Sequence, residues 1–136
     1  MEFKDIIQKR RSVREFTDET VSDEKLRRVL EAALLAPSGS NRQAWKFVVV
    51  KDANKRKALA QAASNQAFVG QAPIIIVAVA LMPERIMACG VPSYAVDLAI
   101  AMEHIVLAAV DEGADISSLP YCSQENVSTD CISPTD

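Results

Sequence analysis

The chain begins with two stretches whose hydrophobic positions repeat with the period of an α-helix. The first places Phe3, Ile6 and Ile7 on one face and ends where an arginine-rich segment begins. The second follows Ser22, a suitable N-cap, and ends before Pro37, which cannot continue a helix. The expected buried face of this second helix consists of Leu26, Val29, Leu30, Ala33 and Leu34.

Two apolar runs of strand length follow. Residues 45–50 are aromatic and β-branched, which is typical of a strand, and a lysine-rich helix pattern follows near residues 54–64. Pro73 then precedes residues 74–81, which are apolar at every position. A strand that is apolar on both faces is expected to be buried on both faces.

The longest predicted element is a helix over residues 94–112, capped by Ser93 and about 28 Å long. It is apolar nearly all round, which predicts a central buried helix. A transmembrane span is the alternative, but Asp97, Glu103 and His104 interrupt the segment. Asp97 and His104 are seven residues apart and share a face. His104 fits a hydrogen-bonded core or interface residue better than a catalyst, because no nucleophile or second metal ligand stands beside it.

Composition indicates one globular domain. The chain has 136 residues, of which 49% are hydrophobic and 24% charged. The charged N-terminal stretch does not resemble a signal peptide, so a cytoplasmic location is expected. The three cysteines are odd in number and widely spaced, which favours unpaired thiols over a disulfide framework or a zinc site.

Charge is distributed very unevenly along the chain. Fourteen of the fifteen Lys and Arg residues lie within residues 1–57 with nine acidic residues, giving +5, whereas residues 58–136 carry −8. An anion is therefore expected to bind the first half. Nucleic acid is one candidate, but acidic residues are interleaved with the basic ones and few aromatic side chains accompany them. We therefore expect no nucleic-acid partner.

Residues 10–14, here called the Arg segment, are the first candidate site. Arg10, Arg11, Ser12 and Arg14 would give a phosphate monoester permanently charged, bidentate donors and a hydroxyl if the backbone turns there. The alternative is a solvated basic helix end that complements the helix dipole. The segment alone does not decide between them.

Residues 37–43, here called the polar loop, are the second candidate site. Gly39 permits close approach of the backbone, Ser38 and Ser40 offer hydroxyls, and Asn41 presents a donor beside an acceptor. Such a pair suits an imide edge like that of a flavin ring. An ordinary helix-to-strand loop would explain Pro and Gly, but not the whole order Pro-Ser-Gly-Ser-Asn-x-Gln-x-Trp.

Over about residues 1–113 the chain resembles the nitroreductase family of FMN-dependent oxidoreductases. In that family a motif like the Arg segment holds the FMN phosphate and ribityl chain. A motif like the polar loop reaches the flavin of the partner subunit, although Ala44 stands here in place of the usual proline. The resemblance assigns FMN binding to Arg10, Arg11, Ser12 and Arg14, and to Pro37, Ser38, Gly39 and Asn41.

The same resemblance implies an α+β fold in which helices pack a central sheet around a long buried dimer helix. It also implies a homodimer with FMN at the subunit interface. The reaction would pass a hydride from NAD(P)H through the flavin to a nitroaromatic, a quinone or a similar acceptor by a ping-pong mechanism. No residue of the protein is assigned as catalytic, and neither a metal nor a membrane is implied.

The resemblance stops after Gly113, so we divide the chain into an FMN-binding domain, residues 1–113, and an atypical polar tail, residues 114–136. The tail has no Lys or Arg, five serines and two prolines, and its apolar residues follow no period. It is expected to add little to the core, although residues 114–119 could form a short strand beside residues 74–81. If the C-terminal strands of the family are missing, the alternative interpretation is a truncated and inactive dimer that binds flavin or a nucleotide.

Overall fold

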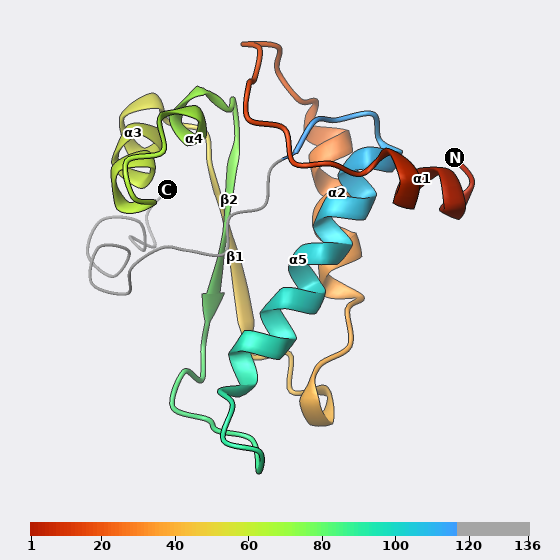
Figure 1. Cartoon of the computed structure of the whole chain (residues 1–136), viewed down its shortest axis with the longest axis vertical. Coiled ribbons are helices and arrows are strands. Elements are labelled where there is room, and N and C mark those ends of the chain that lie inside the picture. Colours follow the sequence, from red (N-terminus) through yellow and green to blue (C-terminus); the bar gives the residue numbers. More distant parts are fainter. Residues whose placement is uncertain (117–136) are drawn as a thin grey trace.

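The computed structural model describes residues 1–116. Two helices, α2 (Asp23–Leu34) and α5 (Ser93–Asp111), pack side by side and lie against a two-stranded sheet (Figure 1). The short helix α1 (Phe3–Lys9) lies beside one end of α5. The main core forms where α2, α5 and the sheet meet, around Val29, Ala33, Ile105 and Ala109.

Helix α2 follows the predicted pattern at its start and along most of its buried face. The Ser22 hydroxyl accepts a hydrogen bond from the Lys25 backbone N–H at 3.3 Å and so caps the helix. Val29 and Ala33 are buried against α5, as expected. The prediction was wrong for Leu34, which is 57% exposed. Leu34 lies one helical step, about 100°, from Ala33, which takes it to the side that α5 does not cover.

The first helix also has the predicted bounds, but its apolar face is uncovered. Phe3 is 69% exposed and Ile7 48% exposed, and none of the residues of α1 is buried. The N-terminal amino group, one turn before α1, forms an ion pair with Asp111 near the end of α5. Ile6 is partly buried, so α1 is held beside α5 with two of its three apolar side chains left exposed.

The long helix α5 differs from the prediction in its cap and its burial. Pro92, not Ser93, occupies the N-cap position, and the Ser93 N–H is satisfied by the Arg85 carbonyl instead. The helix buries Ala101, Ile105, Val106 and Ala109, while Val96 is 40% exposed. Within residues 1–116, one face of α5 is covered and the others are partly open to solvent. By length and composition α5 could cross a membrane, a test that core helices of soluble proteins also pass.

The described sheet has two antiparallel strands, β1 (Trp45–Val50) and β2 (Ile75–Ala80). Trp45 pairs with Ala80 at one end and Val50 with Ile75 at the other. The strand expected at residues 74–81 therefore exists, but it is not fully buried, because every residue of β2 is partly exposed. Within the described residues, α5 covers β2 on one side and no third strand pairs with it, which explains the exposure.

Two helices connect the strands, α3 (Ala53–Ala62) and α4 (Ala67–Gln71). Asp52 caps α3 by accepting a hydrogen bond from the Lys55 backbone N–H. The Arg56 guanidinium donates to the carbonyls of Gly70 and Ala72 at 3.0 and 2.6 Å. These bonds join α3 to the end of α4, and the pair packs as a unit beside the sheet (Figure 1).

Charged groups join the start of α2 to the end of α5. The Arg28 guanidinium donates from Nε and Nη2 to the two carboxylate oxygens of Glu112 at 2.6 and 2.7 Å. These hydrogen bonds lower the pKa of the Glu112 carboxyl. Lys25 adds a hydrogen bond to the Glu112 carbonyl.

The start of the tail is part of the packed structure, contrary to the sequence-based expectation. Ala114 and Ile116 are partly buried against the main core, and the Ile116 carbonyl accepts a hydrogen bond from the Val13 N–H at 3.1 Å. For residues 114–116 the prediction was wrong, because hydrophobic periodicity detects only repeating patterns. One or two apolar residues that pack against the core just after a helix form no such pattern. Residues 114–116 form no strand. The rest of the tail lies outside the described residues.

This contact predicts the effect of shortening the chain. A chain ending at Gly113 should be less stable than one ending at Ile116, because it loses one backbone hydrogen bond and the half-buried Ile116 side chain. Together these are worth about 1–2 kcal/mol, or about 4 °C or more in melting temperature. Thermal melts of the two shortened chains measure the difference. Both lack residues 117–136, so equal melting temperatures would show that residues 114–116 are dispensable.

Candidate functional site

The Arg segment follows α1 directly and is open to solvent. Arg10 is the C-cap of α1, and Arg10, Arg11, Ser12 and Arg14 are all exposed. Within residues 1–116 none of the three guanidiniums has a hydrogen bond or an ion pair. This differs from Arg28 and Arg56, whose guanidiniums are held by carboxylate or carbonyl oxygens. In the part of the chain that the structure describes, the Arg segment therefore offers three unpaired cations within five residues.

The backbone of the Arg segment is nevertheless fixed at one point. Val13 is half-buried, and its N–H donates to the Ile116 carbonyl. The segment thus runs beside the chain that leaves α5, with exposed residues on both sides of Val13. An anchored backbone carrying unpaired guanidiniums loses less entropy when it binds an anion than a free chain would.

The polar loop runs between α2 and β1 and includes a short 3₁₀ turn, η1 (Gly39–Asn41). The Ser38 hydroxyl accepts a hydrogen bond from the Gln43 N–H at 2.9 Å and closes the loop. On its inner side Ala36 is buried with Trp45 and with Ala101 of α5. Pro37, Gly39 and Asn41 are exposed and Ser38 is half-buried.

Three residues of the polar loop have the left-handed backbone conformation that favours glycine. Ser40 and Asn41 both have φ = 53°, and Gln43 has φ = 51°. Each such residue costs about 1–3 kcal/mol unless the surroundings fix it, and strain of this kind concentrates at functional sites. The polar loop therefore has a defined backbone conformation that its surroundings fix, and it is more than a connection between a helix and a strand.

Hydrogen bonds inside the loop leave specific groups for a ligand. The Asn41 Oδ1 accepts from the Gln43 Nε2 at 3.0 Å, and Arg42 Nη1 donates to the Gly39 carbonyl at 3.0 Å. The Asn41 amide nitrogen has no partner within residues 1–116. Asn41 was expected to offer both a donor and an acceptor, but its acceptor is already used, so it presents chiefly a donor.

Two side chains of α5 contact the polar loop and the end of α2, and sequence reasoning placed them on a common face without assigning Asp97 to the loop. Asp97 Oδ1 accepts a hydrogen bond from the Gly39 N–H at 3.0 Å. The Nδ1 atom of His104 lies 2.9 Å from the Ala32 carbonyl of α2. The predicted common face is confirmed, and His104 is the hydrogen-bonded interface residue that was expected. A charged residue in an apolar helix requires a polar partner when it is half-buried. This requirement is the signal that could have assigned Asp97 to the polar loop.

The structure does not bring the two candidate sites together within one chain. The Arg segment lies near the start of α2 and the polar loop near its end (Figure 1). The twelve residues of α2 separate them by about 18 Å along the helix. One chain therefore cannot close both groups around the same part of a ligand.

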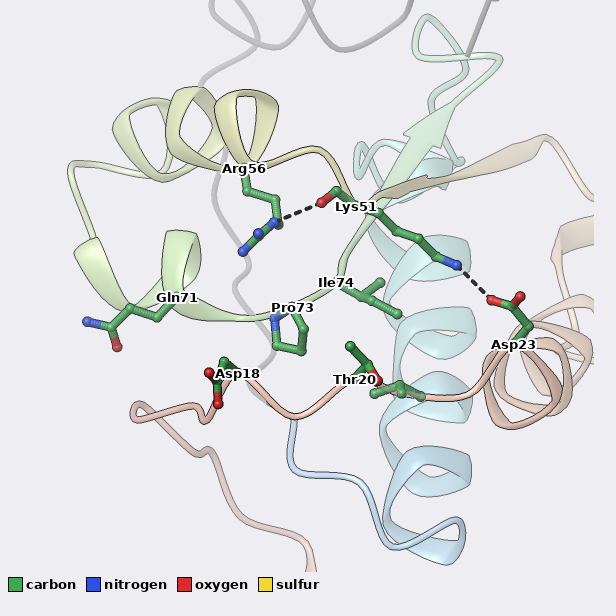
Figure 2. A pocket seen from close by; sticks show the side chains of 9 residues that line it. Asp18, Thr20, Asp23, Lys51, Arg56, Gln71, Pro73 and Ile74 are labelled. Carbon is green, nitrogen blue, oxygen red and sulfur yellow. Dashed lines mark hydrogen bonds and ion pairs between the residues drawn. The ribbon is translucent and has the colours of Figure 1, made fainter.

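A separate hollow of about 460 Å³ lies between residues 18–23 and the helices α3 and α4 (Figure 2). Three of its four charged side chains already have partners, since Lys51 pairs with Asp23 at 2.7 Å and Arg56 donates to backbone carbonyls. The lysine lowers the pKa of Asp23. The hollow includes no residue of the Arg segment or the polar loop, so it is not the predicted site.

Comparison with known proteins identifies the class of protein. The sequence model of the Nitroreductase family matches residues 7–78, which include the Arg segment, the polar loop, β1 and the first part of β2. A solved nitroreductase family protein from Clostridium novyi NT has a TM-score of 0.77 and 39% identity, covering 83% of this chain and 66% of that one. A nitroreductase from Desulfitobacterium hafniense, solved with bound FMN, has a TM-score of 0.71 and 30% identity, covering 87% and 70%.

Among curated proteins, the "NADH dehydrogenase" of Thermus thermophilus is 48% identical over 69 residues, which are 51% of this chain and 34% of that protein. The chain thus spans about a third of this relative and about two thirds of the Clostridium novyi protein. The chain belongs to the nitroreductase family. Its α+β fold, with helices packed on a small sheet, is the part of the family fold that these residues provide.

Proposed function

We propose that two copies of this chain bind FMN at their interface, each site combining the Arg segment of one copy with the polar loop of the other. The separation of these two groups along α2 carries the proposal, because a partner subunit is needed to bring them to one ligand. The uncovered apolar surface of α1 and α5 supports it, since a second copy would bury Phe3, Ile7 and Val96.

The donor set of each group fits a part of FMN. Arg10, Arg11, Arg14 and Ser12 match the phosphate and the ribityl hydroxyls, because guanidiniums form bidentate, charge-assisted bonds to phosphate oxygens. Pro37, Ser38, Gly39 and Asn41 match the ring. The Asn41 amide nitrogen is a free donor, and exposed Gly39 lets the backbone approach the ring closely. The bound FMN of the Desulfitobacterium hafniense relative supports this choice of cofactor.

We further propose that the assembled protein is an oxidoreductase that takes electrons from NAD(P)H and passes them to a nitroaromatic, a quinone or a similar small acceptor. FMN would supply the hydride chemistry when bound, and alternating binding of the two substrates gives ping-pong kinetics. The chain's own residues hold the phosphate, orient the ring and place positive charge near it. The name of the Thermus thermophilus relative supports NADH as one reductant.

Mixing two defective variants tests the shared site. The Arg10→Ala/Arg14→Ala variant and the Asn41→Ala variant should each bind FMN weakly. Unfolded together and refolded, half of the dimers should be mixed, and each mixed dimer should contain one intact site and one doubly defective site. About a quarter of all sites should then recover wild-type FMN affinity. A mixture that binds no better than its components would contradict a site shared between subunits.

Turnover is tested separately on the wild-type chain. FMN-loaded protein should be yellow, should sediment as a dimer at micromolar concentration, and should bleach when NADH or NADPH is added under nitrogen. Re-oxidation by an added quinone would complete the cycle. Stable binding without bleaching would support the inactive flavin-binding dimer, and a colourless monomer after reconstitution with FMN would contradict the proposal as a whole.

A further inference from the structure

The first N–H group of η1 needs an acceptor that the polar loop does not provide. The first N–H groups of a helix have no acceptor within the helix, and the N-cap side chain, here that of Ser38, normally accepts from one of them. Ser38 makes no such bond, because its hydroxyl already accepts from the Gln43 N–H. Asp97, 58 residues further along the chain, accepts from the Gly39 N–H instead at 3.0 Å.

Asp97 connects the polar loop to α5, the helix that contributes to the main core. It lies on the same face of α5 as His104, which contacts the Ala32 carbonyl, and two turns before Ile105, which is fully buried. A Cβ at Gly39 would be 3.9 Å from Asp97 Oδ1 and 3.8 Å from Arg42 Nη1. The two charged side chains therefore hold the N–H and the carbonyl of Gly39 from different elements.

This restraint acts on the residues that the loop would present to a ligand. Ser40 and Asn41 follow Gly39 directly, and both have the left-handed conformation that persists only when neighbouring contacts fix it. Pro37 and Ala36 fix the loop on one side and Trp45 on the other, but Asp97 is the described side chain from outside the loop that hydrogen-bonds η1.

We propose that Asp97 is a positioning residue for the cofactor: it fixes η1 so that the Gly39–Asn41 backbone and the Asn41 amide are pre-arranged for the flavin ring. The inference rests on the proposed function. Without the carboxylate, η1 would sample other conformations, and FMN binding would have to restore the bound one at a cost in affinity. Because Asp97 lies on α5, the arrangement of the loop also depends on the helix proposed to face the partner subunit.

The test compares Asp97→Ala and Asp97→Asn with Glu103→Ala. Asparagine keeps an oxygen that can accept from the Gly39 N–H, and Glu103→Ala removes an exposed acid from the same helix without touching the loop. We expect Asp97→Ala to weaken FMN binding about tenfold, measured by quenching of FMN fluorescence, and Asp97→Asn and Glu103→Ala to change it less than about threefold. Hydrogen exchange at the Gly39 amide in the FMN-free protein should accelerate in Asp97→Ala alone.

The outcomes separate this inference from the proposed function. Wild-type affinity in Asp97→Ala would overturn the positioning role and leave the FMN site in place. Equal losses in Asp97→Ala and Glu103→Ala would also overturn it, since they would reflect a general perturbation of α5 and not the loss of the contact with Gly39. Failure of every chain, wild type included, to bind FMN would overturn the proposed function and this role with it. If Asp97→Ala does not fold, Asp97→Asn still decides: FMN affinity within about threefold of wild type together with slow Gly39 exchange is expected, and loss of affinity without faster Gly39 exchange contradicts the inference.

Discussion

Replacing Arg10 by alanine is expected to weaken FMN binding by about 10- to 150-fold. Its guanidinium is exposed and has no partner within the described chain, so it is free to bind phosphate. A lost charge-assisted hydrogen bond to phosphate corresponds to about 1.5–3 kcal/mol. Titration of FMN fluorescence at low salt measures the change. The stability of the FMN-free protein should be little affected, because the Arg10 guanidinium makes no hydrogen bond or ion pair within residues 1–116.

Two further variants show whether the effect comes from Arg10 itself. Arg27→Ala removes an exposed arginine that pairs with Glu31 on α2, and it should leave FMN affinity unchanged. Arg10→Lys keeps the charge but loses the planar pair of donors, so it should bind with intermediate affinity. Equal losses in Arg10→Ala and Arg27→Ala would mean that the overall positive charge of residues 1–57 attracts FMN, without a defined phosphate site.

Replacing Ile105 by alanine should lower the free energy of unfolding by about 2–5 kcal/mol. Its side chain is fully buried in the core cluster with Val29, Ala33 and Ala109, where α2 meets α5. The alanines on both helices allow close packing, so little nearby volume can move into the cavity. Such a loss is a large part of the 5–15 kcal/mol of a typical domain. Urea denaturation at fixed protein concentration measures the change.

The matched control is Ile86→Ala, because Ile86 is 55% exposed in the connection between β2 and α5. The same chemical change there should alter stability by less than about 0.5 kcal/mol. Similar losses at the two positions would show that α2 and α5 do not form the main core. A large loss at Ile86 alone would instead place that connection in a buried contact between subunits.

Much of the local structure could be predicted because it is encoded over a few residues. Ser22 caps α2 through the backbone of Lys25, three residues later, and Pro37 stands just beyond the end of that helix. The strand β1 occupies the whole predicted run of residues 45–50. Both candidate motifs were visible as ordered patterns of polar residues, and the family match includes both of them.

Burial was predicted less well, because it depends on what covers an element as well as on its own pattern. The patterns of α1, α5 and β2 correctly marked apolar faces. In the described chain those faces lack enough covering structure, so Phe3 is exposed and β2 is only half-buried. Periodicity measures the hydrophobicity of a face and not the presence of a partner for it. Ile116 shows the converse, since a residue without any period joins the core.

The sequence by itself determined the family, the positions of most helices and strands, and the residue types that suit phosphate and a flavin ring. These depend on short-range signals: caps, periods and motif order. Only the tertiary structure decided how those pieces are arranged. It placed the Arg segment and the polar loop at opposite ends of α2, joined Asp97 to Gly39 across 58 residues, and fixed Val13 to Ile116. Such contacts depend on how the chain packs in three dimensions, and no spacing along the sequence records them.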